Sequence, residues 1–216
     1  FSPESEVPFC GHATIALGAV LAQEFGNKAY QLHLNHGSIS VEGEVRQDEI
    51  RASLQSPATR SAAPSAEMLA TALALFGLVP EQLDTKIPPA LIHGGADHLL
   101  LCLTSRQALA DMRYELDRGR EFMQQHGLVT IMLVFAETVQ LFHSRNAFAS
   151  GGVYEDPATG AASAAFAGYL RDLNWPHQGQ ITLIQGEDMG MRSRLRAEIP
   201  AAPGSSIRVS GTARIM

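Results

Sequence analysis

Apolar positions recur along the chain at two spacings, one typical of helices and one typical of strands. Helical spacing that ends at a glycine predicts helices such as 13–25 and 65–76. Alternation of apolar and polar residues, as in Ile39-Ser40-Val41-Glu42, predicts strands with one buried face. The predicted helices span 13–25, 65–76, 160–173 and, as one or two helices, 106–125. The predicted strands span 30–34, 39–45, 50–54, 98–104, 129–135, 139–142, 181–184, 194–199 and 207–210.

The order of these elements predicts an α+β fold. Most strands follow one another directly or after a short turn, which favours antiparallel sheets. The regular alternation of strand and helix that a doubly wound sheet requires is missing from the pattern. Residues 55–64 (QSPATRSAAP) are rich in proline, serine and alanine, and we interpret them as a linker or domain boundary.

Composition narrows the class of protein. With 216 residues, 45% hydrophobic and 18% charged, the chain resembles folded globular proteins rather than disordered ones. No apolar run approaches the ~18 residues of a membrane span, so no membrane partner is expected. A net charge of −6 argues against nucleic acid as a partner, because proteins that bind it carry basic surfaces.

The two cysteines differ in their surroundings. Two are too few for a disulfide framework in a chain of this length, which favours a reducing compartment, and we expect the cytoplasm. Cys102 lies in the apolar run 99–103 and is expected to be a buried, inert thiol. Cys10 lies instead in a segment of small and polar residues.

Two segments carry small residues where helices should begin, 9–14 (FCGHAT) and 155–165 (EDPATGAASAA). Small residues let a second backbone or a ligand approach closely, and the first turn of a helix offers unpaired N–H groups to an anion. Each segment also contains a side chain suited to proton transfer, His12 in the first and Asp156 in the second. If the two starts face each other, they would bind a small carboxylic acid between an acid and a base. The alternative is close helix packing, with His12 and Asp156 only capping their helices.

Other polar residues give weaker signals. Arg145 could pair with a substrate carboxylate or form a surface salt bridge. The histidine pairs His33/His36 and His93/His98 lack the spacing of zinc motifs, so no metal site is expected.

In their order along the chain, these segments resemble the phenazine-biosynthesis PhzF-like isomerases, relatives of diaminopimelate epimerase and proline racemase. Residues 1–14 resemble the family's FTP…EV…CGHAT entry to a first central helix, and 155–160 (EDPATG) resemble the start of its second. Residues 185–195 resemble its QG…MGRPSRL segment, and Val209-Ser210-Gly211 its closing strand. The resemblance covers nearly the whole chain.

The resemblance implies a diaminopimelate-epimerase-like fold, in which two pseudo-symmetric domains each wrap a sheet around a central helix. Residues 1–57, joined by the final strand 211–216, would be the remainder of the N-terminal domain, and 58–210 the C-terminal domain. The site would lie in the cleft between them. The implied activity is isomerisation by proton transfer at carbon in a small carboxylic acid, without a cofactor, in a possible homodimer.

By the same resemblance, His12 and Asp156 are expected to orient the substrate and shuttle protons, as the catalytic residues. Backbone N–H groups near the second helix start are expected to bind the substrate carboxylate. The expected substrate-binding residues are Gly11, Thr159, Gly160 and Ala161.

The chain departs from the family pattern at three places. Ala161 replaces a serine found in many relatives, and Met191-Arg192 replaces Arg-Pro. The family's acid–base glutamate lies upstream of the segment that begins at Phe1, and neither Glu4 nor Glu6 matches it. We therefore expect the chain as given to be catalytically incomplete and to lack the first strands of its domain, leaving an unpaired sheet edge.

Two other functions stay open. An amino-acid racemase or epimerase would use Cys10, which occupies the place of a catalytic thiol in racemase relatives, but no second cysteine accompanies the second helix start. A non-catalytic small-molecule binding protein on the same fold is favoured by the missing glutamate.

Overall fold

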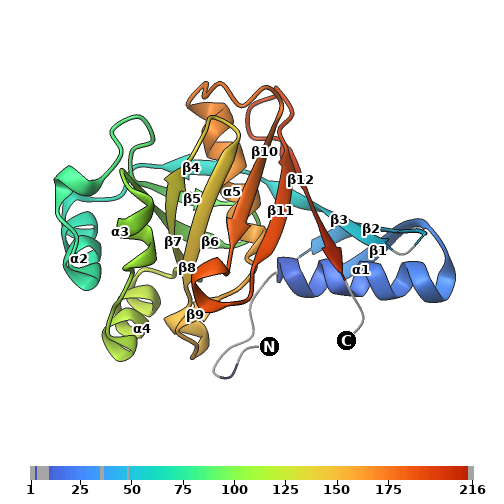
Figure 1. Cartoon of the computed structure of the whole chain (residues 1–216), viewed down its shortest axis with the longest axis horizontal. Helices are drawn as coiled ribbons and strands as arrows, with labels where there is room; N and C mark the ends of the chain where they lie inside the picture. Colours follow the sequence, from blue (N-terminus) through green and yellow to red (C-terminus); the bar gives the residue numbers. More distant parts are fainter. Residues whose placement is uncertain (1–2, 4–9, 35–36, 48, 214–216) are drawn as a thin grey trace.

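The computed structural model describes Pro3 and residues 10–34, 37–47 and 49–213 (Figure 1). Apart from Pro3, the predicted motif residues 1–9, with Glu4 and Glu6, lie outside the described residues, as do His36 and 214–216. The α-helices are α1 (Gly11–Phe25), α2 (Ala66–Phe76), α3 (Arg106–Ala110), α4 (Leu116–Gln125) and α5 (Gly160–Asp172). Short 3₁₀ helices are η1 (Pro80–Gln82), η2 (Ala149–Gly151) and η3 (Glu187–Met189). The strands are β1 (Lys28–Leu34), β2 (Gly37–Arg46), β3 (Glu49–Ala58), β4 (Arg60–Ala62), β5 (Ala90–His93), β6 (Asp97–Leu103), β7 (Thr130–Ala136), β8 (Leu141–Ala147), β9 (Glu155–Asp156), β10 (Gln180–Gln185), β11 (Ser193–Glu198) and β12 (Ser206–Ala213).

One large sheet connects the whole described structure. Its strand order is β1-β2-β3-β12-β11-β10-β8-β7-β6-β5-β4, with β9 paired to β8. Neighbours are antiparallel except β8 with β10 and β6 with β7, which are parallel. The predicted α+β class and the mostly antiparallel pairing are therefore confirmed.

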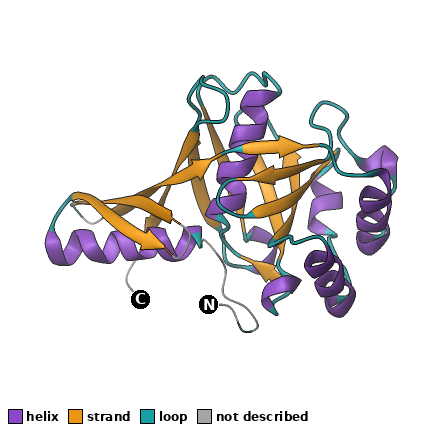
Figure 2. Cartoon of the chain, turned by 180° about the vertical axis from the view of Figure 1, so that it is seen from behind, coloured by secondary structure: helices purple, strands orange, loops and turns teal. Residues whose placement is uncertain are grey.

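Helix α5 lies at the centre of the larger part of the molecule, where the sheet curls around it (Figure 2). It contacts β4 and β5 from one end of the strand order and β10, β11 and β12 from the middle. Its residues are buried on every side except at Tyr169 and Asp172. Alanine and glycine give this helix a small diameter, which lets strands approach it from all directions.

Helix α1 is covered much less completely. It packs against β2, β3 and β12 in the part of the molecule that projects away from α5 (Figure 1). Ile15, Ala19 and Ala22 face those strands, whereas Leu17, Val20 and Phe25 are exposed. The two central helices therefore differ in burial, although both begin with small residues.

The face of the sheet that points away from α5 carries α2, α3 and α4 (Figure 1). Their apolar residues pack on the odd-numbered positions of β6 and β7, such as Leu101 and Leu133. The even-numbered positions, such as Cys102 and Met132, face α5. Cys102 is fully buried, as predicted. None of the helices in the described residues is long and apolar enough to span a membrane.

The segment 55–64, interpreted as a linker or domain boundary, is mostly strand. Residues up to Ala58 belong to β3, and Arg60–Ala62 form β4. Pro57 is tolerated because β2 pairs with β3 only as far as Gln55, and the register with β12 shifts at the same place. The placement of a domain boundary near this point stays a prediction.

Candidate functional site

The starts of α1 and α5 touch each other. A Cβ atom built on Gly11 would lie 2.5 Å from the Cα of Gly160, closer than real Cβ atoms come to a neighbour. Ala161, in the first turn of α5, lies at the same contact, with its backbone nitrogen 3.0 Å from that Cβ position. The structure therefore brings together three of the residues predicted to bind substrate. No side chain of the described residues caps either helix start.

His12 reaches from the first turn of α1 to the segment that precedes α5. Its Nδ1 lies 2.9 Å from the carbonyl oxygen of Ala158, and because a carbonyl only accepts, Nδ1 carries the proton. The same nitrogen lies 3.6 Å from Oδ1 of Asp156, close enough for an ion pair. The side chain of His12 is 48% exposed and that of Asp156 only 10%. The two predicted catalytic residues are thus neighbours, one half-exposed and one buried.

Asp156 is fixed by its own segment and does not cap the helix. Helix α5 begins only at Gly160, with Thr159 as the N-cap residue, so the alternative in which Asp156 caps the helix is wrong. The Thr159 hydroxyl donates to Oδ2 of Asp156 at 2.6 Å, which leaves Oδ1 directed toward His12. Asp156 itself lies in β9, where it pairs with Asn146 of β8.

The side chain of Gln185 forms hydrogen bonds with Asp156 and Thr159, and the sequence predicted no role for it. Its Nε2 donates to the carbonyl of Asp156 at 2.7 Å and to the Thr159 hydroxyl at 3.0 Å, and its Oε1 accepts from the Thr159 N–H at 3.0 Å. The side chain is fully buried. A signal exists in the sequence, because Gln185 continues the inward-facing alternation of Ile181 and Leu183, where a polar residue requires a buried partner.

Electrostatics favour a charged His12. A hydrogen bond with the Cys10 thiol and the charge of Asp156 raise the pKa of His12 to about 9, against the opposing effect of burial. The Cys10 sulfur lies 3.7 Å and 3.8 Å from the two ring nitrogens. Burial alone would raise the pKa of Cys10, but the hydrogen bond and charge of His12 lower it overall. At neutral pH the ring is therefore an imidazolium, able to donate a proton rather than to accept one.

Arg145 forms a salt bridge, as one of the two interpretations predicted, but the pair is buried rather than at the surface. It is buried at 7% exposure, and its Nε lies 3.1 Å from both carboxylate oxygens of Glu155. Its Nη1 donates to the carbonyl of Ala110 at 2.8 Å. This buried ion pair lies on the face of β8 and β9 that points away from Asp156. Because it links the two strands, it holds β9 in place.

The histidines outside the site have separate environments. His93 bonds to Asp97 at 2.8 Å, His33 to Ser38 at 3.0 Å, and His98 is fully buried. Within the part of the chain that the structure describes, no three or more His, Cys, Asp or Glu side chains gather as a metal site would require.

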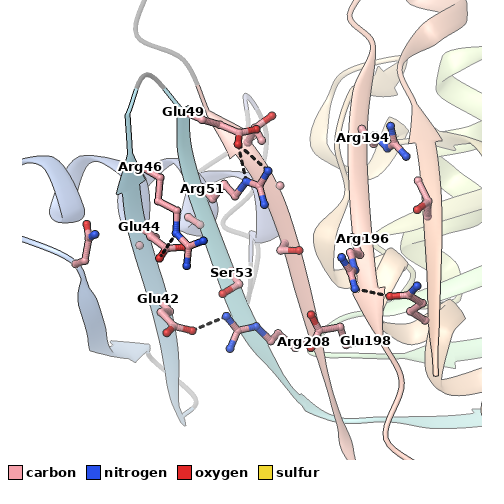
Figure 3. A pocket seen from close by; sticks show the side chains of 18 of the residues that line it. Glu42, Glu44, Arg46, Glu49, Arg51, Ser53, Arg194, Arg196, Glu198 and Arg208 are labelled. Atoms are coloured by element: carbon pink, nitrogen blue, oxygen red, sulfur yellow. Dashed lines mark hydrogen bonds and ion pairs between the residues drawn. The ribbon is translucent and has the colours of Figure 1, made fainter.

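A hollow lies elsewhere, on the outer face of the sheet formed by β2, β3, β12, β11 and β10 (Figure 3). Neither His12 nor Asp156 lines it. Its charged side chains pair along the sheet, as in Arg46 with Glu44 and Arg51 with Glu49, both at 2.6 Å. The lining holds six basic and four acidic side chains but neither histidine nor cysteine, so the candidate site remains at the two helix starts, where His12 meets Asp156.

Comparisons with known proteins bear on the family and on the fold. The sequence model of the family described as phenazine biosynthesis-like protein (PhzC-PhzF) matches residues 1–216. An uncharacterised isomerase of Mesorhizobium japonicum is 29% identical over 232 residues, which cover 99% of this chain and 75% of that protein. The trans-2,3-dihydro-3-hydroxyanthranilate isomerase of Pseudomonas aeruginosa is 29% identical over 217 residues, covering 98% of this chain and 73% of that enzyme.

Solved structures show the same fold. A predicted epimerase of Pseudomonas aeruginosa superposes with a TM-score of 0.83 at 26% identity, covering 100% of this chain and 77% of that one. A probable proline racemase of Agrobacterium radiobacter superposes with a TM-score of 0.65 at 11% identity, covering 99% of this chain and 69% of that one, a likeness of fold alone. The epimerase-like α+β fold expected from the resemblance is thereby confirmed.

Proposed function

Because this chain belongs to the phenazine biosynthesis-like (PhzC-PhzF) family, whose named relatives include isomerases, we propose that it isomerises a small carboxylic acid by moving a proton between carbon atoms, without a cofactor. The observation that carries the proposal is the pairing of His12 with Asp156 across two touching helix starts. That arrangement unites an acid, a carboxylate and two sets of first-turn N–H groups in one place.

Each group has a role that follows from its surroundings. His12, protonated at neutral pH, donates a proton to the substrate carbon as a general acid. Asp156 holds the imidazolium by charge, and the Ala158 carbonyl sets the orientation of the ring. The N–H groups at Gly160 and Ala161 bind the substrate carboxylate, which the positive end of the α5 dipole favours.

The base that removes the first proton belongs to a segment outside these 216 residues in this proposal. The resemblance places the family's acid–base glutamate ahead of Phe1, and about a quarter of the Mesorhizobium relative has no counterpart in this chain. Among the residues that the structure describes, the charged groups that shift the pKa of His12 are Cys10 and Asp156, and neither is such a glutamate. The test must therefore use the protein with whatever segment precedes Phe1.

The experiment follows deuterium. The full-length protein is incubated in D₂O with trans-2,3-dihydro-3-hydroxyanthranilate, the substrate that the name of the Pseudomonas relative gives, and with a panel of small cyclic and amino carboxylates. We expect a shifted double bond and one deuterium at carbon, seen by NMR and mass spectrometry. His12→Asn and Asp156→Asn should each lower the rate by about 100-fold or more, since general acid–base groups contribute ~10²–10⁴. His126→Asn, a histidine at the end of α4, is the matched control. Failure of every compound to exchange would overturn the proposal.

One observation favours a second candidate, thiol-based racemisation. Cys10 has a lowered pKa and lies beside His12, as a thiol that moves protons would. Cys102 cannot be its partner, because it is fully buried in β6 and burial raises its pKa to about 12. Cys10→Ala separates the two: it preserves exchange if His12 is the acid and abolishes it if the thiol is required.

A binding protein on the same fold gives a different result. Calorimetry would then show binding of a small carboxylate, while no deuterium enters the ligand.

A further inference from the structure

Buried polar side chains gather beneath the start of α5, at one end of the sheet. They come from the starts of β6 and β7 and the ends of β8 and β10, where the strand register pairs His98 with Thr130 and Ser144 with Gln185, and sets Asn146 opposite Met132. We call this set the polar layer, and each member is at most 3% exposed. Its members are His98, Thr130, Ser144, Asn146 and Gln185. Apolar side chains share this face with them, since Met132 lies opposite Asn146 and Val134 opposite Ser144.

Hydrogen bonds link part of the polar layer in a fixed direction. The Thr130 hydroxyl donates to Oδ1 of Asn146 at 3.1 Å, and Nδ1 of His98 lies 2.8 Å from the same hydroxyl. A hydroxyl has one proton to donate, so His98 must donate from Nδ1, which leaves its Nε2 as an acceptor. Burial lowers the pKa of His98 to about 3, which keeps the ring neutral.

Three atoms of the polar layer have no hydrogen-bond partner among the residues that the structure places. They are Nε2 of His98, Oγ of Ser144 and Nδ2 of Asn146. A buried polar atom without a partner costs about 1–3 kcal/mol, so native proteins satisfy nearly all of them. Buried water is the usual partner, at roughly one molecule per 27 residues. Three such atoms within one layer point to water held there.

Asn146 connects this layer to the candidate site. It lies directly opposite Asp156 in the β8–β9 pair, and directly opposed side chains share a face with Cβ atoms about 4.5–5.5 Å apart. The Arg145–Glu155 ion pair occupies the other face of the same two strands. The amide nitrogen of Asn146 and the carboxylate of Asp156 are therefore within reach of one bridging water.

We propose that Asn146 is a positioning residue, which holds the carboxylate of Asp156 toward His12 through a buried water shared with the polar layer. The role rests on the proposed function, since it matters only if the pair of Asp156 and His12 does chemistry. The water accepts from Nδ2 of Asn146 and donates to Asp156.

The test follows His12 by NMR and needs no substrate. In the full-length protein, Asn146→Leu keeps the side-chain shape but removes the amide. The control is Phe142→Leu, which changes a fully buried residue on the same strand and face without removing a polar atom. When Asp156 turns away, the titration midpoint of His12 should fall by about 0.5 pH units, part of the effect of one nearby charge. Phe142→Leu should leave the midpoint unchanged. A folded Asn146→Leu protein with the wild-type midpoint would overturn the proposal.

A second measurement covers the case in which Asn146→Leu does not fold. A high-resolution crystal structure of the unaltered full-length protein should show water within about 3.2 Å of both Nδ2 of Asn146 and the carboxylate of Asp156. Density without water at that position would refute the bridge. Neither measurement depends on turnover, so a protein that binds and titrates as expected but exchanges no deuterium would contradict only the proposed function.

Discussion

Replacing Asp156 by asparagine isolates the charge that acts on His12. The Asp156→Asn side chain keeps the shape and an oxygen for the Thr159 hydroxyl, and removes only the negative charge. Two unit charges 3.6 Å apart attract by about 1.2 kcal/mol in water and by about 4.6 kcal/mol at an effective dielectric constant of ~20. One pKa unit corresponds to about 1.36 kcal/mol, so these limits are roughly 0.8 and 3.4 units. Because the His12 side chain is 48% exposed, solvent screens the pair and the lower limit applies. We expect the pKa of His12 to fall by about one unit from its value of about 9.

The assay is a pH titration of the His12 ring protons by NMR, between about pH 5 and 10.5. Asp172→Asn is the matched control, because it removes the same charge from a carboxylate that pairs with Arg171 on the far end of α5. It should leave the His12 midpoint where it is in the unaltered protein. A folded Asp156→Asn protein whose His12 midpoint moves by less than ~0.2 units would refute the electrostatic pairing of the two residues.

The same substitution changes how stability depends on pH. The folded-state pKa of His12, about 9, lies above the ordinary value of 6.5, so the folded protein binds this proton more tightly than the unfolded chain. The resulting stabilisation is complete below pH 6.5 and is lost as the pH rises through 9. Urea unfolding should therefore show a larger loss between these pH values for the unaltered protein than for Asp156→Asn. The difference should not exceed about 1 kcal/mol, since His12 is half-exposed.

Three further substitutions or modifications test the scaffold around the site. Arg145→Met leaves Glu155 buried without a partner and should lower the free energy of unfolding by about 3–5 kcal/mol in urea; a loss below 1 kcal/mol would contradict the buried pair. Iodoacetamide at pH 7.5 should modify Cys10 and leave Cys102 intact. If mass spectrometry of the folded protein shows both cysteines modified, or neither, the reactive Cys10 of lowered pKa and the buried Cys102 described above are contradicted. Gly11→Ala brings a methyl group against the backbone of the facing helix, so we expect at least a tenfold loss of exchange and about 1–3 kcal/mol of stability, measured by thermal unfolding. A Gly11→Ala protein as stable and active as the original would show that the helix starts are not in contact.

Periodicity predicted most elements of the fold, and its failures have local causes. Residues 65–76 match α2 because Ser65 caps the helix and Gly77 ends it in a left-handed conformation, both of which are visible in the sequence. The strand Ala90–His93 was not predicted, because four residues between prolines and glycines give too short a pattern. The end of β3 was not predicted because of Pro57. The strand accepts a proline here only because its pairing with β2 has already ended at Gln55.

The sequence predicts those members of the candidate site whose residue type alone suggests proton transfer at the start of a helix. His12 and Asp156 stand out by themselves, yet their distance apart follows from contact between segments far apart in the chain, as His12 and Ala158 are, 146 residues from each other. Gln185 and Asn146 were not predicted, because a single amide at the end of a strand resembles any surface residue. They differ from surface residues only in their position in the alternation of side chains along the strand, which points them inward on the same face as Leu183 and Phe142.

Asp156 is held more firmly by its surroundings than His12, and this difference affects how the site would work. Asp156 and its segment receive hydrogen bonds from the Thr159 hydroxyl and the Gln185 amide, inside the fully wrapped surroundings of α5. His12 has one hydrogen bond to a carbonyl, long contacts with the Cys10 sulfur and one weak ion pair, on a helix with an exposed apolar face. Its side chain is 48% exposed and that of Asp156 only 10%, so we expect the ring to move more readily than the carboxylate. In the proposed reaction we therefore expect a substrate that enters between the helix starts to displace His12 before Asp156, with the carboxylate as the fixed group and the imidazolium as the adjustable proton donor.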